Sequence, residues 1–172
     1  MKRTFLIIII FVFMLSGCST DYIENIDSFI IKFNEYAKEK IDKNSMILSE
    51  NKESISYYYM FENESVIEIE NELKNMHIKS VSLTAEKYSE NFKNRAQAVL
   101  KSLSEYDFEN AEALTDNLFS DTKKEYANEM HTLKYITINY TKTSVGLKFT
   151  VTYNEEVPVI TTVTPETMKE FS

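Results

Sequence analysis

Glycine and proline are scarce in this chain of 172 residues, with two of each. Glycine-rich loops that wrap phosphate groups need several closely spaced glycines, and long flexible linkers need many glycines or prolines. The only glycines are Gly17 and Gly146. The sequence therefore argues against a nucleotide-binding loop of this kind and against a string of loosely linked domains.

Cysteine and histidine are equally sparse, and only Cys18, His77 and His131 are present. One cysteine forms no disulfide within a molecule, and two distant histidines lack the ligand spacing of a zinc site. No serine lies in the G-x-S-x-G pattern of hydrolases. We therefore predict no catalytic residue, no metal site and no cofactor, and we interpret each histidine as an ordinary surface residue.

Positive charge is outnumbered by negative charge: 19 basic residues stand against 27 acidic ones, for a net charge of −8. Without Lys2 and Arg3, which lie in an N-terminal segment that we expect to be removed, the balance is 17 − 27 = −10. A surface this acidic repels nucleic acids and other polyanions. We therefore exclude nucleic acid as a partner.

The N-terminus has the pattern of an export signal. Lys2 and Arg3 precede an unbroken apolar run from Phe5 to Met14, which is too short to cross a bilayer comfortably. The next residues, Leu15-Ser16-Gly17-Cys18, resemble the lipobox of bacterial lipoproteins. An uncleaved N-terminal anchor with an incidental cysteine is the alternative interpretation.

The lipobox resemblance implies a specific maturation. Residues 1–17 would be removed, Cys18 would carry a diacylglyceryl group, and in some bacteria a further acyl chain such as palmitate would be added. Two or more acyl chains anchor a protein stably, whereas one binds membranes only marginally. Residues 18–21 would form a short tether, and the protein would lie on the extracytoplasmic face of the cell membrane.

Apolar side chains recur at helical spacing from Tyr22 to Ile41 and predict an amphipathic helix. Asp21 is the expected N-cap, with Glu24 three residues later. The polar face carries both signs of charge, which favours packing on a sheet over lying on a membrane, because interfacial helices usually carry a cationic face. Period-two alternation then predicts an antiparallel meander of four strands, at 46–50, 55–61, 66–70 and 77–84.

The second half again begins with helices. The pattern predicts helices near 88–103, 107–118 and 122–130, then strands at 133–141, 145–153 and 157–164, and a short last helix starting at Pro165. The predicted order is α-ββββ-ααα-βββ-α. The fold class is therefore α+β, an antiparallel sheet packed by helices in a single domain that spans 22–172. An old duplication or ordinary alternation would both produce two halves of this kind.

Residues 95–130 are similar to the opening helices of NTF2-like lipoprotein domains. The likeness is carried by Tyr106-Asp107-Phe108-Glu109-Asn110-Ala111, an acidic and aromatic segment that starts a helix. The resemblance implies an NTF2-like cone as an alternative fold. The residues after this segment leave room for fewer strands than such a cone usually has.

The main candidate binding surface consists of tyrosines on predicted strands: Tyr57, Tyr58, Tyr59, Tyr135, Tyr140 and Tyr153. Aromatic platforms bind sugars and peptides because they combine a flat apolar face with a polar tip. Successive strand residues point to opposite faces, so Tyr58 must face away from its two neighbours. Tyrosine also packs at the rim of a core, which is the alternative role for the whole set.

A group of acidic residues follows one predicted hairpin, namely Glu62, Glu64, Glu68 and Glu70. Two such carboxylates would serve acid–base chemistry or bind calcium. The spacing does not match a known calcium loop. A solvated strand face is therefore the default interpretation.

The address, the single domain and the lack of a catalytic constellation together predict a membrane-anchored, non-enzymatic binding module. Its partner would be an envelope protein, a peptide or a glycan. A small-ligand pocket protein or an enzyme without a recognisable motif is the first alternative. A surface immunity or exclusion lipoprotein is the second.

Overall fold

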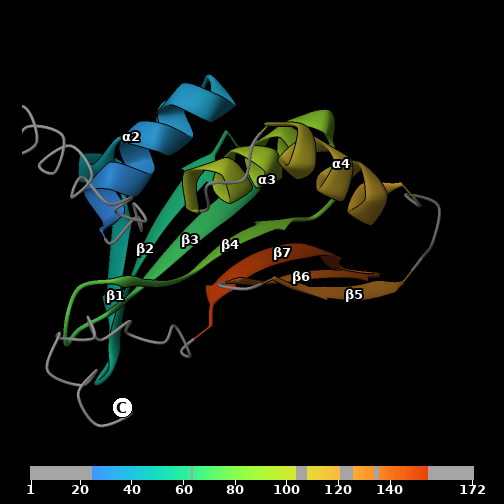
Figure 1. Cartoon of the computed structure of the whole chain (residues 1–172). Coiled ribbons are helices and arrows are strands. Elements are labelled where there is room, and N and C mark those ends of the chain that lie inside the picture. Colours follow the sequence, from blue (N-terminus) through green and yellow to red (C-terminus); the bar gives the residue numbers. More distant parts are fainter. Residues whose placement is uncertain (1–24, 63, 104–107, 121–125, 134–135, 155–172) are drawn as a thin grey trace, which may run out of the picture.

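In the part of the chain that the computed structural model describes, three α-helices lie on one face of a seven-stranded antiparallel sheet (Figure 1). The structure describes residues 25–62, 64–103, 108–120, 126–133 and 136–154. Within these ranges the predicted α+β class and the packing of helices on an antiparallel sheet are confirmed. The predicted strand at 157–164 and the last helix lie outside the described residues.

The first half of the chain forms a helix and a meander of four strands. Its elements are α2 (Ile26–Ala37), the short 3-10 helix η1 (Lys43–Ser45), β1 (Ile47–Glu50), β2 (Ser54–Phe61), β3 (Ser65–Glu72) and β4 (Ile78–Ala85). The second half forms α3 (Glu90–Leu103), α4 (Phe108–Phe119), β5 (Ala127–Thr132), β6 (Ile136–Thr143) and β7 (Gly146–Tyr153). Each half therefore places helix before sheet, as the sequence predicts.

The two meanders join through their last strands. The order across the sheet is β1-β2-β3-β4-β7-β6-β5, so β4 pairs with β7 at the centre and the first strand of each meander lies at an edge. At this junction Val81 is opposite Val151 and Ser82 is opposite Thr150. The two halves therefore form one continuous sheet, joined by the antiparallel pairing of β4 with β7.

Alternation along the strands creates two unlike faces. The register aligns Tyr57, Ile69, Val81, Val151 and Ile138 in one row across five strands. All five are buried under the helices. The neighbouring row on the opposite face consists of Tyr58, Glu68, Ser82, Thr150 and Asn139. We call these the covered face and the open face.

The core fills the space between the helices and the covered face. Phe29 and Phe33 of α2 and Phe92 of α3 are fully buried, as are Leu83 and Phe149 of the sheet. The helices contact one another in the order α2, α3, α4, and α3 contacts the central strands β4 and β7. The apolar stripe of α2 therefore packs inside the protein, as its mixed charges predicted.

The first described helix is shorter than the predicted one. Asn25, rather than Asp21, is the N-cap of α2, and its side chain accepts a hydrogen bond from the backbone N–H of Ser28 at 2.9 Å. The helix ends at Ala37 because Lys38 adopts a left-handed conformation with φ 56°. Ile41 is buried beyond the helix, where its backbone N–H donates to the Asn34 side chain at 2.7 Å.

The predicted third helix at 122–130 is wrong over its described part. Ala127–Met130 belong to β5, which pairs with β6 along its whole length. Residues along β5 alternate between partly buried and exposed, the pattern of a strand. Pairing with the edge of the sheet has overridden the local helical pattern, because a short segment gains more from a full ladder of hydrogen bonds than from its own propensity.

Gly146 begins β7 at a point where no other residue fits. Its φ is +154°, and a Cβ atom there would lie 2.6 Å from the carbonyl oxygen of Ala85. The close approach allows β4 and β7 to pair as far as Ala85, the last residue of β4, which lies opposite Leu147. The hairpin turn lies at Ser144-Val145, whereas the predicted strands at 133–141 and 145–153 placed it at 142–144.

Candidate functional site

Most of the predicted tyrosine surface lies on the covered face. Tyr57 and Tyr140 are buried in the core. Tyr59 is half-buried and its hydroxyl donates to the carbonyl of Lys40 at 3.3 Å. The hydroxyl of Tyr153 donates to the carbonyl of Leu103 at 2.6 Å. These four side chains therefore have the rim or core role that the sequence offered as the alternative.

Tyr58 is the exception among the described members of the set, and Tyr135 lies outside the described residues. Tyr58 points to the open face, opposite Ile47 of β1 on one side and Glu68 of β3 on the other. Its hydroxyl donates to Oε1 of Glu68 at 2.7 Å. This hydrogen bond to a carboxylate raises the pKa of Tyr58 above its ordinary value of 10.0.

Apolar side chains surround Tyr58 on the open face. Ile47 is 72% exposed and Met60 is 64% exposed. Met60 lies opposite Val66, which is half-buried, so these side chains occupy adjacent positions on three neighbouring strands. We call Ile47, Tyr58, Met60 and Val66 the Tyr58 patch. An exposed apolar cluster next to polar residues is typical of a protein interaction site.

The acidic hairpin is split by the fold. Glu68 and Glu70 border the Tyr58 patch on the open face, where Oε2 of Glu70 accepts a hydrogen bond from Ser80 at 3.1 Å and Oε1 lies 3.5 Å from Lys79 Nζ. Glu62 and Glu64 lie instead in the β2–β3 turn. In the described part of the chain, no group of three or more His, Cys, Asp or Glu side chains is placed to hold a metal ion.

Beyond the patch, the open face is lined mainly by hydroxyl and amide side chains. Ser82 and Thr150 are hydrogen-bonded to each other at 3.0 Å, and Thr137 donates to Asn154 at 2.7 Å. Lys148 is the charged residue among the open-face positions of β7. The Tyr58 patch is therefore a contiguous apolar corner of the open face, whereas Met130, which is also exposed on this face, lies on β5 at the opposite edge of the sheet.

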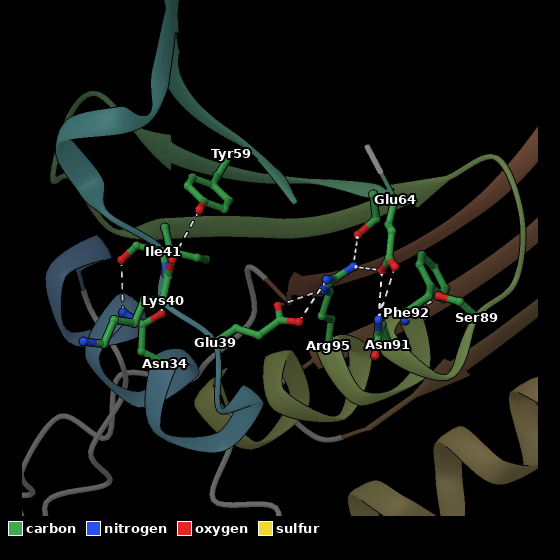
Figure 2. A network of polar contacts seen from close by, with 11 residues as sticks. Asn34, Glu39, Lys40, Ile41, Tyr59, Glu64, Ser89, Asn91, Phe92 and Arg95 are labelled. Atoms are coloured by element: carbon green, nitrogen blue, oxygen red, sulfur yellow. Dashed lines mark hydrogen bonds and ion pairs between the residues drawn. The ribbon is translucent and has the colours of Figure 1, made fainter. Parts of the chain in front are cut away.

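Arg95 organises a second polar cluster, on the covered side of the sheet (Figure 2). Its side chain is 5% exposed. Nε and one terminal nitrogen donate to the two carboxylate oxygens of Glu39, both at 2.9 Å. The other terminal nitrogen donates to Glu64 at 3.0 Å and to Ser65 at 2.9 Å. The guanidinium also lies over the ring of Phe61, 4.2 Å from its centroid.

The Arg95 cluster connects three segments that are distant in sequence. It ties α3 to Glu39, which follows α2, and to the turn between β2 and β3. Burial alone lowers the pKa of Arg95, but Glu39 and Glu64 outweigh that effect and raise it. The Asn91 hydrogen bond, with help from Arg95, lowers the pKa of Glu64. Four hydrogen bonds engage the guanidinium, so the cluster is a structural clamp.

Sequence reasoning did not single out Arg95. The sequence nevertheless distinguishes this residue, because it is the only arginine apart from Arg3 in a chain whose other basic residues are lysines. A bidentate pair with a carboxylate needs a planar guanidinium, which lysine does not supply. An isolated arginine on a helix in a lysine-rich chain is therefore a mark of a fixed, buried ion pair.

The histidines lie apart from both clusters. His77 is exposed just before β4. His131 lies on β5 with Nε2 3.9 Å from Oε2 of Glu129. No helix in the described ranges is both long enough and apolar enough to cross a membrane.

Comparison with known proteins provides no relative from which a role could be transferred: the chain matches no protein-family model, no curated protein and no solved structure at a significant level. Neither the lipoprotein resemblance nor the NTF2-like resemblance gains support from these comparisons. The functional argument therefore rests on the residues themselves.

Proposed function

We propose that this protein is an extracytoplasmic lipoprotein whose folded domain binds a partner in the cell envelope through the Tyr58 patch. The address comes from the lipobox-like Leu15-Ser16-Gly17-Cys18. The binding role comes from the patch, because the helices bury the covered face and leave an apolar corner of the open face in solvent.

One observation carries the binding role: Ile47 and Met60 are both mostly exposed, on adjacent strands, beside the ring of Tyr58. A single exposed apolar residue such as Met130 is ordinary, but a contiguous exposed group on a sheet face is not. Such a group exposes apolar surface to water and lowers the solubility of the domain. A partner that covers the group removes this surface from water.

The proposed anchor also limits where the partner is found. Asn25, the N-cap of α2, follows Cys18 by seven positions. A chain of that length spans at most about 25 Å when fully extended. The domain would therefore remain close to the membrane, and its partner would lie at the membrane surface or in the adjacent wall.

The address is tested by replacing the thiol. Cys18→Ala should abolish labelling by a palmitate analogue and release the protein from the membrane fraction or stall it as a precursor. Ser19→Ala, which changes the next residue and leaves the thiol, should remain labelled and membrane-bound. Unchanged membrane attachment of the Cys18→Ala protein would contradict the lipoprotein proposal.

The binding role is tested by crosslinking in intact cells that express the full-length protein. Replacing Met60 with Lys should abolish a crosslinked partner that the wild type captures. Val145→Lys is the matched control, because Val145 is 85% exposed and lies in the β6–β7 turn, outside the patch. Equal capture by both variants would show that the Tyr58 patch is not the binding surface.

A further inference from the structure

The Tyr58 patch has the width of a helix. It extends from Ile47 on β1 to Val66 on β3, which is two strand spacings, or about 10 Å. Along the strands, the rows from Met60 to Glu70 cover about 14 Å at the usual rise per residue. An α-helix has a diameter of about 10 Å with its side chains, so one helix of two to three turns covers this surface.

Apolar and acidic groups are segregated within this surface. Met60 and Val66 form the row at one end, Ile47 and Glu68 lie on opposite sides of Tyr58 in the next row, and Glu70 lies in the row after that. The Glu68 carboxylate is held in place by the Tyr58 hydroxyl at 2.7 Å. That bond occupies the tip of Tyr58 and leaves its ring as the contact surface, and a tyrosine ring attracts a cation placed over its face.

Charge decides among the partners that this surface would fit. The chain as a whole is acidic, with a net charge of −8, so a second copy or an anionic lipid headgroup meets like charge. The basic residues of the open face near the patch are Lys79, which pairs with Glu70, and Lys148 on β7. Glu68 has no described basic partner within ion-pair distance.

We infer that the Tyr58 patch receives a basic amphipathic helix of a partner protein or peptide, and this inference rests on the proposed binding function. Apolar side chains of the helix cover Met60, Val66 and Ile47. Lysine or arginine side chains on its flank pair with Glu68 and Glu70 or lie over the ring of Tyr58. Opposite charge would speed association and fix the orientation of the helix, while apolar burial would supply most of the affinity.

The inference is tested with two designed helical peptides of equal length and equal leucine content, one carrying lysine and the other glutamate at its polar positions. The protein is the whole mature chain with Cys18→Ala, so that no lipid competes. We expect the lysine peptide to bind at least about tenfold more tightly than the glutamate peptide in fluorescence anisotropy at low salt, and the difference to shrink as salt is added.

Variants locate the site and separate the two sources of affinity. Met60→Lys should weaken lysine-peptide binding about tenfold or more, since an apolar contact is lost and a like charge is introduced. Glu68→Gln with Glu70→Gln should weaken it severalfold and reduce its salt dependence. Val145→Lys adds the same charge elsewhere and should leave the affinity within about twofold. Circular dichroism confirms that each variant is folded.

The outcomes distinguish this inference from the proposed function. Equal binding of both peptides, or full binding by Met60→Lys, overturns the inference. If neither peptide binds but Met60→Lys still abolishes capture in cells, the patch is a binding surface for another chemistry, such as a neutral glycan, and the inference alone fails. If Met60→Lys changes neither peptide binding nor capture, both fail.

Discussion

The two faces of the sheet are made by the same strands and differ in almost every physical respect. Among the described residues, the covered face is aliphatic and aromatic and packs against α2, α3 and α4, and Arg95 of α3 is a buried cation on this side. The open face carries hydroxyl groups, carboxylates and the Tyr58 patch. Stability therefore depends mainly on the covered face, whereas the proposed binding surface lies on the open face.

The largest expected contrast comes from two neighbours on β7. Phe149 is fully buried on the covered face, and Lys148 is exposed on the open face. Phe149→Ala should lower the free energy of unfolding by about 3–5 kcal/mol, because it removes buried area and leaves a cavity. Lys148→Ala should change it by less than about 0.5 kcal/mol. Urea denaturation followed by circular dichroism measures both, and similar values would refute the assignment of stability to one face.

Substitution of Arg95 tests how much the buried polar cluster on the covered side contributes to stability. Arg95→Met should lower the free energy of unfolding by about 2 kcal/mol, less than for a fully buried pair because Glu39 and Glu64 are partly exposed to water. Arg95→Lys should recover only part of that loss, since an ammonium group cannot bind Glu39 through two parallel hydrogen bonds. Full recovery by lysine would show that charge alone matters, not the planar geometry.

Glu64 lies at the exposed rim of the Arg95 cluster, and its lowered pKa predicts that the stability of the protein depends on pH. Its pKa in the folded protein is below the ordinary value of 4.5, chiefly because Asn91 donates a hydrogen bond to it. The unfolded state therefore binds the proton more readily, so the contribution of Glu64 is present above pH 4.5 and is lost as the pH falls through the lowered pKa. Stability curves measured from pH 7 to pH 3 should fall less steeply in Glu64→Gln than in the wild type.

Substitution of Tyr58 should have the smallest effect on the free energy of unfolding. The titration of its hydroxyl reports directly on the open face. Tyr58→Phe should cost less than about 1 kcal/mol, the usual net value of one hydrogen bond outside the core. The hydroxyl of the wild type should ionise above pH 10.0, because its hydrogen bond to the Glu68 carboxylate stabilises the protonated form. Its contribution to stability is present below the unfolded pKa and is lost as the pH rises through the raised one. Glu68→Gln should bring the ultraviolet-monitored titration of Tyr58 back towards pH 10.0.

Local patterns were sufficient for much of the fold. The alternation in Ile55 to Phe61 and in Val66 to Glu70 predicted β2 and β3, and the helical spacing from Tyr88 to Leu103 predicted α3. The same alternation correctly placed Tyr58 opposite its neighbours. These segments have one strong period each, and that period survives packing because a shift of one residue would expose a whole apolar face.

Other features depended on contacts that no local pattern contains. Ala127–Met130 became a strand because β6 offered an unpaired edge. Tyr57 of β2 and Tyr140 of β6 share the covered face because pairing of β4 with β7, far apart in the chain, joins the two meanders into one sheet. Arg95 meets Glu39 across 56 positions of sequence. A pattern read within a window of residues does not carry this information.

By itself, the sequence determined the α+β class, the alternation of apolar and polar residues on most strands, the acidic charge and the single cysteine in its lipobox-like setting. The tertiary structure decided which face of the sheet the helices cover. It therefore decided that Tyr57 and Tyr140 belong to the core while Tyr58 stays accessible beside Ile47 and Met60. The physical reason is that alternation fixes only that two faces differ, whereas burial depends on which surface the helices reach after the strands have paired.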